Sequence, residues 1–126
     1  ENIEFTGWVS GDKKISYLKN ARALVFPSLW YEGAPLTIVE MLSRGIPCIV
    51  PDKCAASECV THGFNGYLFK IGDIESLKES IKMMTVEESK RMSRNIINSF
   101  DSYSYSESAH SSSLMEIYRD ILSHKL

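Results

Sequence analysis

Three short apolar runs, separated by helical patterns, constrain the fold of this 126-residue chain more than any other feature. They cover residues 23–26, 47–50 and 66–69. Continuous apolarity, rather than strict alternation, is typical of strands that are buried on both faces. We expect helices over residues 35–44 and 55–60, between these runs. Strands that alternate with helices predict a parallel, doubly wound sheet, which binds ligands beyond the carboxyl ends of its strands.

The rest of the chain extends this pattern at both ends. The further expected elements are a strand over residues 3–7 and helices over residues 12–20, 74–84, 86–100 and 107–123. Ser10 and Asp73 stand where side chains commonly cap the start of a helix. Residues 63–66 are expected to form a turn, because an Asn-Gly pair tolerates positive φ. Residues 101–108, rich in Ser and Tyr, would link to the last helix.

We therefore expect the fold class α/β, in the form of a Rossmann-like parallel sheet with flanking helices. Residues 1–106 would form the domain that contains the sheet, and residues 107–126 a C-terminal helix. Apolar residues recur along that helix at helical spacing, which predicts one apolar face. They are Leu114, Ile117, Tyr118, Ile121 and Leu122.

The charge and the cysteines argue against several classes of protein. The net charge is −2 and acidic and basic residues are mixed, so we expect no nucleic-acid partner. Three cysteines without a framework spacing argue against a disulfide scaffold and favour a reducing cytoplasm. Cys54, Cys59 and His62 loosely resemble a metal-binding pattern. A fourth ligand is lacking, so we expect no metal and interpret the cysteines as small buried side chains.

A loop-to-helix segment, residues 32–40, carries the candidate chemistry. Gly33 would let the backbone pass close to a ligand. Pro35 at the first helical position has no N–H group, so the first free donors would be the amides of Leu36 and Thr37. Free amides and the helix dipole together form an anion site that suits a phosphate.

Two glutamates flank this anion site. Glu40 would lie about 7 Å further along the helix axis, where it can accept two hydrogen bonds from a vicinal diol such as ribose. Glu32, before the helix, could accept hydroxyl groups from whatever is attached beyond the phosphate. The alternative is that both are solvated surface carboxylates, since Ile38, Val39 and Leu42 cover the inner face of the helix.

A series of motifs runs along the chain: residues 2–9, 26–28, the glutamates at 32 and 40, and residues 44–47, 57–60, 65–68 and 72–73. This series resembles glycosyltransferase family 4, a group of retaining enzymes with the GT-B fold. A glutamate pair at this spacing is a weak signal alone, whereas the whole series in this order is specific. The resemblance implies that the chain is the donor-binding, C-terminal part of such an enzyme.

The resemblance also implies a role for each candidate residue. Glu32, the catalytic candidate, would contact the donor sugar, and Glu40 the ribose hydroxyls. The backbone from Ala34 to Thr37 would line the sugar and the phosphates. The backbone of Val9 would meet the nucleobase, and Lys14 is a further candidate for contact with the base or the ribose.

Members of this family transfer a sugar from a UDP-, GDP- or ADP-sugar to an acceptor hydroxyl and keep the anomeric configuration. The resemblance implies no metal, because cationic side chains and helix N-termini neutralise the leaving diphosphate. The departing phosphate oxygen would accept the proton of the acceptor, so no nucleophile is expected here. A role in polysaccharide or glycolipid synthesis follows, with a location in the cytoplasm.

The resemblance further implies that parts of the enzyme lie outside this chain. The first residue is not Met, so we expect an excerpt of a longer protein. The Arg and Lys that hold the diphosphate would lie upstream, together with the N-terminal domain that binds a saccharide or lipid acceptor. Residues 107–126 would brace that domain, and the complete enzyme would associate peripherally with the membrane. We expect this chain alone to be inactive and to bind the donor weakly.

The usual strand order of such a sheet is 3-2-1-4-5-6, and the four expected strands match the third to the sixth. The strand over residues 3–7 would then lack its neighbours. Because an exposed edge invites pairing with another chain, we predict that this chain dimerises.

Two other functions remain open at this point. One is another GT-B enzyme that acts on nucleotide sugars, such as an epimerase, although the paired glutamates argue against it. The other is a non-catalytic nucleotide-binding or interaction module. A Rossmann dehydrogenase is disfavoured, because no Gly-x-Gly-x-x-Gly motif follows a strand.

Overall fold

The core of the molecule is a parallel sheet. The computed structural model describes residues 2–30, 32–101 and 103–123. Within them, strands β1 (Leu24–Val25), β2 (Cys48–Pro51) and β3 (Gly66–Phe69) pair in the order β1-β2-β3. Both pairings are parallel, and Ile49 of β2 lies opposite Tyr67 of β3. The α/β class, the three apolar strands and the sequential order of the last three strands are confirmed.

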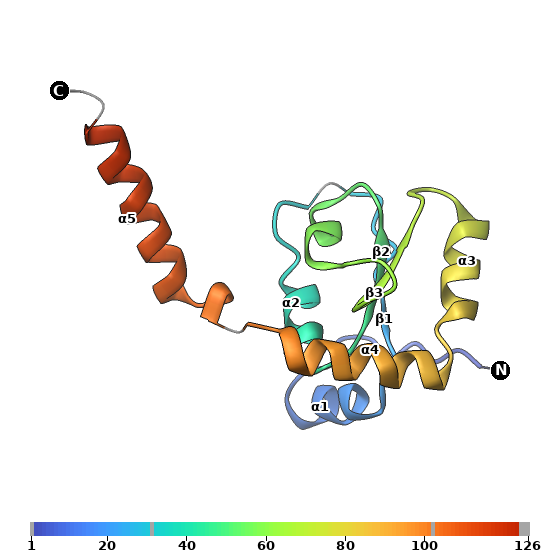
Figure 1. Ribbon diagram of the computed structural model, residues 1–126. Helices are drawn as coiled ribbons and strands as arrows, with labels where there is room; N and C mark the ends of the chain where they lie inside the picture. The colour runs from blue at the N-terminus through green and yellow to red at the C-terminus, as the bar shows by residue number, and fades with distance from the viewer. Residues whose placement is uncertain (1, 31, 102, 124–126) are drawn as a thin grey trace.

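Helices cover the two faces and one end of this sheet (Figure 1). Helix α2 (Leu36–Ser43) and the short 3-10 helix η1 (Ala55–Cys59) lie on one face. Helix α3 (Ile74–Met83) lies on the other face, and α4 (Val86–Ser99) crosses the lower end of the strands in this view. Helix α1 (Gly11–Asn20) lies below α4. The arrangement is the three-layer packing that the alternating pattern predicts.

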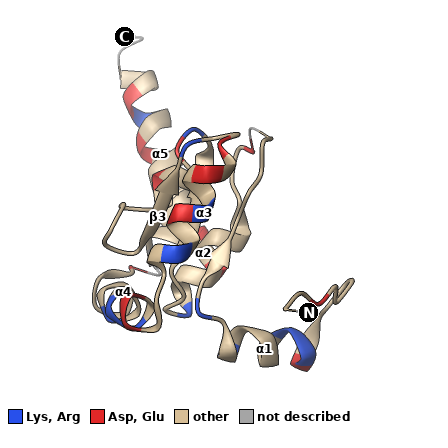
Figure 2. Ribbon diagram, turned by 90° about the vertical axis from the view of Figure 1, so that its right-hand side faces the viewer, with Lys and Arg blue, Asp and Glu red and all other residues tan. Residues whose placement is uncertain are grey.

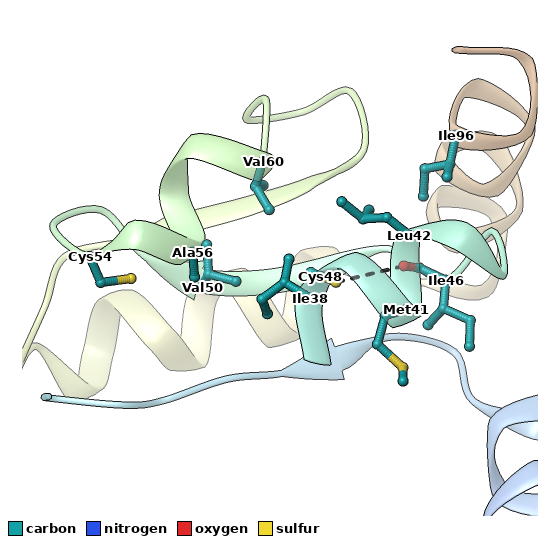
Figure 3. Packing of buried hydrophobic residues seen from close by; sticks show 10 residues of the cluster. All are labelled: Ile38, Met41, Leu42, Ile46, Cys48, Val50, Cys54, Ala56, Val60 and Ile96. Atoms are coloured by element: carbon teal, nitrogen blue, oxygen red, sulfur yellow. Dashed lines mark hydrogen bonds between the residues drawn. The ribbon is translucent and has the colours of Figure 1, made fainter. Parts of the chain in front are cut away.

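The larger core cluster forms between β2 and its neighbours on the α2 side (Figure 3). Cys48 and Val50 point from the strand toward Ile38 of α2, which is fully buried. Burial of a side chain of this size contributes about 1.5–3 kcal/mol. Ile96 of α4 joins the same cluster, so α4 is fixed to the sheet through α2.

The alternate residues of the strands form a second cluster on the opposite face. Ile49, Tyr67 and Phe69 point to this side, where they meet Met84, the residue after α3, and Met92 in the middle of α4. Every residue of β2 is therefore buried, as a strand covered on both faces requires.

Local signals explain where several helices begin and end. Asp73 accepts a hydrogen bond of 3.0 Å from the Ser76 amide, which confirms it as the cap of α3. Thr85 caps α4 in the same way through the Glu88 amide. Gly45, with φ of +74°, follows α2 in the left-handed conformation that ends many helices.

The expected strand over residues 3–7 is wrong. Residues 3–7 lie outside every strand, and Ile3 and Phe5 are 75% and 95% exposed. A strand is stable only when its backbone groups pair with a neighbour, and no strand pairs with this segment in the described residues. The hydroxyl of Tyr17 in α1 donates a hydrogen bond of 2.9 Å to Glu4 Oε1 and so connects this segment to the rest of the molecule. Ser10 does stand at the start of α1, but its side chain makes no capping hydrogen bond.

The expected turn over residues 63–66 is present, but its physical basis differs from the prediction. Positive φ occurs at Gly63 rather than within the Asn65-Gly66 pair. Gly66 is needed for space, since an ideal Cβ there would lie 2.0 Å from the carbonyl oxygen of Cys48. Asn65 holds the turn with its side chain, which accepts from the Thr61 amide and donates to the carbonyl of Cys59.

The last helix, α5 (Glu107–Ser123), has the predicted bounds and extends away from the sheet (Figure 1). None of its described residues is buried. The linker before it contains the short helix η2 (Tyr103–Tyr105), where Tyr105 stacks on Phe100 with ring centroids 5.4 Å apart. No helix in the described part of the chain is both long and apolar enough to span a membrane.

Candidate functional site

The candidate site lies at the end of the sheet where the strands finish. Strand β1 ends at Val25, and the chain then passes through a loop to the start of α2 at Leu36 (Figure 1). In open parallel sheets this edge is where ligands bind. The topology therefore places segment 32–40 at the edge that the sequence predicts.

The first turn of α2 presents free backbone donors. Pro35 is the residue before the helix, with ψ of 88°, so it is the N-cap rather than the first helical residue. The Ile38 amide donates to the carbonyl of Pro35 at 2.9 Å. The amides of Leu36 and Thr37 donate to no acceptor among the described residues, and both side chains are exposed. The helix start therefore faces solvent and can receive an anion.

Glu40 lies one turn further along α2 and takes part in an ion pair. Its Oε2 accepts a hydrogen bond of 2.7 Å from Nζ of Lys14, which comes from α1. A guanidinium nitrogen of Arg44 lies 3.8 Å from Oε1. The side chain of Glu40 keeps 31% of its surface exposed. The structure thus brings together two of the predicted residues, which are 26 positions apart in the chain.

Glu32 is held within the loop before α2. Its amide donates to the carbonyl of Trp30 at 3.1 Å, and its Oε1 accepts from the hydroxyl of Ser28 at 3.5 Å. Glu32 is half-buried, while Gly33 and Ala34 are exposed. Open space surrounds the position where Gly33 would carry a Cβ, so a ligand can approach the backbone there.

Val9 is half-buried and stands one residue before the N-cap of α1. Helix α1 itself has no buried residue, although Leu18 packs against the larger core cluster. The contact of Lys14 with Glu40 therefore links α2 to the helix that directly follows Val9.

The site is an open surface rather than a closed pocket. A groove of about 680 Å³ opens elsewhere, between α1 and α4, near the start of the strands. It is lined by Leu18, Pro47 and Ser93 among others, and neither Glu32 nor Glu40 borders it. This groove belongs to the wrong end of the sheet for the chemistry that the α2 segment suggests.

The side chains of Cys48, Cys54 and His62 serve the fold. Burial raises the pKa of the Cys48 thiol to about 12, so it is not a nucleophile at neutral pH. His62 accepts a hydrogen bond of 3.0 Å from the Leu68 amide through Nδ1 and meets Tyr67 edge to face. Cys54 is buried, as expected, whereas Cys59 is half-buried and so departs from that expectation. The described residues contain no group of three or more His, Cys, Asp or Glu side chains placed to hold a metal.

Two neighbours of the glutamates escaped the sequence analysis. Arg44 faces Glu40 from four residues further along α2, a spacing that could have been read from the sequence. Ser28 reaches Glu32 across a loop, for which the sequence holds no such periodic signal. Away from the site, α3, α4 and α5 each carry both acidic and basic residues (Figure 2).

Comparison with known proteins bears on the identity of this site. Residues 1–99 match the family model described as "Glycosyl transferases group 1". The UDP-Gal:alpha-D-GlcNAc-diphosphoundecaprenol alpha-1,3-galactosyltransferase of Escherichia coli is 35% identical over 100 residues, which are 75% of this chain and 25% of that protein. The lipopolysaccharide 1,6-galactosyltransferase of Salmonella typhimurium is 33% identical over 78 residues, which are 60% of this chain and 21% of that protein.

A solved structure shares the fold. The apo form of the lipopolysaccharide outer core galactosyltransferase WaaB aligns with a TM-score of 0.56 and 24% identity. The alignment covers 73% of this chain and 28% of that protein, so the chain spans about a quarter of the length of the relatives it matches. With a family model that matches residues 1–99 and a curated relative that matches three quarters of the chain, this chain belongs to the family of group 1 glycosyltransferases.

Proposed function

We propose that this chain is the donor-binding part of a retaining glycosyltransferase that uses a nucleotide-diphosphate sugar. One observation carries the proposal: the free amides of Leu36 and Thr37 open toward solvent, with Glu32 before them and Glu40 one turn after them. This order matches a sugar, a diphosphate and a ribose in sequence. The helix start needs no metal to receive the diphosphate, since its amides and dipole favour an anion.

Each group has one task in this proposal. Glu40 accepts the two ribose hydroxyls, and the backbone from Ala34 to Thr37 contacts the phosphates and the sugar. Glu32 accepts hydroxyls of the sugar and is the catalytic candidate. The backbone of Val9 meets the base. The bond from the anomeric carbon to the diphosphate oxygen breaks, the acceptor oxygen bonds to that carbon, and the departing oxygen takes the acceptor proton.

The relatives suggest which donor to test first. Both sequence relatives named above are galactosyltransferases, and the name of the first specifies UDP-Gal. We therefore propose UDP-galactose as the donor and a lipid-linked or lipopolysaccharide saccharide as the acceptor. The acceptor would bind to parts of the enzyme outside this chain, in the cytoplasm at the membrane face.

Titration of the ¹⁵N-labelled chain with UDP, GDP and ADP up to millimolar concentration tests the donor site. We expect saturable shifts at the amides of Leu36 and Thr37 with UDP, and their loss in Glu40→Ala. Glu79→Ala removes the same charge from an exposed position on α3 and should bind UDP normally. Indifference to all three nucleotides in the same titration of the full-length protein would instead favour a non-catalytic interaction module.

The apolar face of α5 is proposed to brace the acceptor-binding domain. Ile117, Tyr118 and Ile121 remain 50–57% exposed, and the described part of the chain offers them no cover. Residues 1–106 and 107–126 would then serve different domains of the enzyme. Cleaving the chain before α5 should leave nucleotide-induced shifts unchanged, whereas their loss would show that α5 belongs to the donor site.

We still propose that the chain dimerises, but through the edge of β1 instead of through residues 3–7. The strand over residues 3–7 is absent, but β1 pairs only with β2 in the described sheet and keeps one free edge. Such an edge can pair with a second chain. Light scattering that shows a monodisperse monomer would remove this proposal.

A further inference from the structure

The contact between Lys14 and Glu40 bears on how the site recognises ribose. Its N–O distance of 2.7 Å is that of a charge-assisted hydrogen bond. The side chains are 41% and 31% exposed, so the pair lies at the surface and remains accessible to a ligand. No other charged side chain lies within hydrogen-bond distance of the Glu40 carboxylate in the described residues, since Arg44 is 3.8 Å away.

Lys14 occupies only part of the acceptor capacity of Glu40. An ionised carboxylate offers about four lone-pair sites on two oxygens. The ammonium group uses one site on Oε2, which leaves Oε1 and a second site on Oε2 for hydroxyl donors. A vicinal diol needs two acceptors on one carboxylate, so the diol and Lys14 can bind Glu40 at the same time.

The pair also restricts the motion of the carboxylate. A free glutamate side chain rotates about three bonds, and fixing it on binding costs up to about 2 kcal/mol of entropy. Lys14 approaches from α1, on a different element from Glu40, so its hydrogen bond holds the carboxylate before a ligand arrives. Such preorganisation lowers the cost of binding without any direct contact with the ligand.

We propose that Lys14 is a positioning residue that orients Glu40 to accept both ribose hydroxyls and that does not itself contact the nucleotide. The proposal rests on the donor site described above and deepens it. It differs from direct contact of Lys14 with the base or the phosphates, which would require the ammonium group to leave Glu40.

A comparison of UDP with 2′,3′-dideoxy-UDP separates these roles, because only UDP carries the hydroxyls that Glu40 would accept. Dissociation constants are measured by NMR titration for the unchanged chain and for Lys14→Met, Lys14→Arg and Glu40→Gln. Lys13→Met is the matched control, since it removes the same charge from the neighbouring, exposed position of α1. Thermal unfolding of each variant checks that the fold is intact.

We expect the unchanged chain to prefer UDP over the dideoxy nucleotide by about tenfold or more, as hydrogen bonds to a charged group imply. Lys14→Met should weaken UDP binding about two- to fivefold, the range of an exposed ion pair, and leave dideoxy-UDP binding unchanged. Lys14→Arg should restore most of the preference, and Lys13→Met should keep all of it.

Each other outcome overturns a defined part of the argument. Equal weakening of both nucleotides by Lys14→Met, beyond the effect of Lys13→Met, would show a direct or a merely structural role of Lys14. An unchanged preference in Lys14→Met would show that the pair is irrelevant to the diol. If Glu40→Gln keeps the full preference for UDP, or if the unchanged chain binds both nucleotides equally, the ribose site at Glu40 itself is refuted.

Discussion

Replacing Gly66 with alanine should destabilise the fold strongly, because the first residue of β3 lies against the backbone of β2. An added Cβ would be 2.0 Å from the carbonyl oxygen of Cys48 and 2.9 Å from Cγ1 of Val60. Carbon and oxygen atoms normally approach no closer than about 3.3 Å. The two strands would therefore have to separate by about 1.3 Å at their first paired position, where Cys48 lies opposite Gly66.

The cost of this separation can be bounded. Overpacking in a core costs about 1–3 kcal/mol, and the obstacle here is backbone rather than a flexible side chain, so we expect about 3 kcal/mol. For a chain of this length each kcal/mol lowers the melting temperature by about 4 °C, which predicts a loss of roughly 12 °C. A loss of about 3 kcal/mol is a substantial part of the roughly 5–15 kcal/mol of free energy that stabilises a typical domain.

Thermal unfolding followed by circular dichroism measures the effect, with Gly33→Ala as the matched control. Gly33 lies in open space without positive φ, so alanine there should change the free energy of unfolding by less than about 1 kcal/mol. If Gly66→Ala and Gly33→Ala unfold at the same temperature, the close approach of β2 and β3 described here is refuted.

Two further predictions follow from shifted pKa values. Because burial raises the pKa of Cys48 to about 12, iodoacetamide at pH 8 should label this thiol only after unfolding in urea, as mass spectrometry would detect. Rapid labelling of Cys48 in the folded chain would contradict its burial. The hydrogen bond from Arg91 lowers the pKa of Glu88 below 4.5, so this carboxylate stabilises the fold above that pH and loses its effect as the pH falls through the lowered value. The urea midpoint of the unchanged chain should thus exceed that of Glu88→Gln at pH 7, and this difference should vanish in acid. Glu87→Gln, at an exposed neighbouring position, is the control. A difference that persists in acid would refute the link between the ionisation of Glu88 and the stability of the fold.

Elements whose signals are local could be predicted from the sequence. The apolar run that became β2 predicts a strand covered on both faces, because only burial on both sides favours apolar residues at every position. Asp73 predicts the start of α3, because its carboxylate satisfies an amide three residues away. The placement of segment 32–40 at the carboxyl edge follows from the same logic, since strand order and direction decide where each loop emerges.

Features that depend on distant partners could not be predicted in this way. Residues 3–7 have the composition of a strand, but a strand exists only where a neighbour accepts its hydrogen bonds. The need for glycine at Gly66 comes from the approach of Cys48, which is 18 positions away and belongs to another strand.

The sequence by itself determined the α/β pattern, the order of the elements and the residue types at the candidate site. Periodicity and helix caps act over a few residues, so a linear reading is enough to find them. Only the tertiary structure decided that Lys14 meets Glu40 and that the site is open to solvent. The contact between Lys14 and Glu40 joins α1 to α2, and its geometry exists only once both helices have taken their places in the fold.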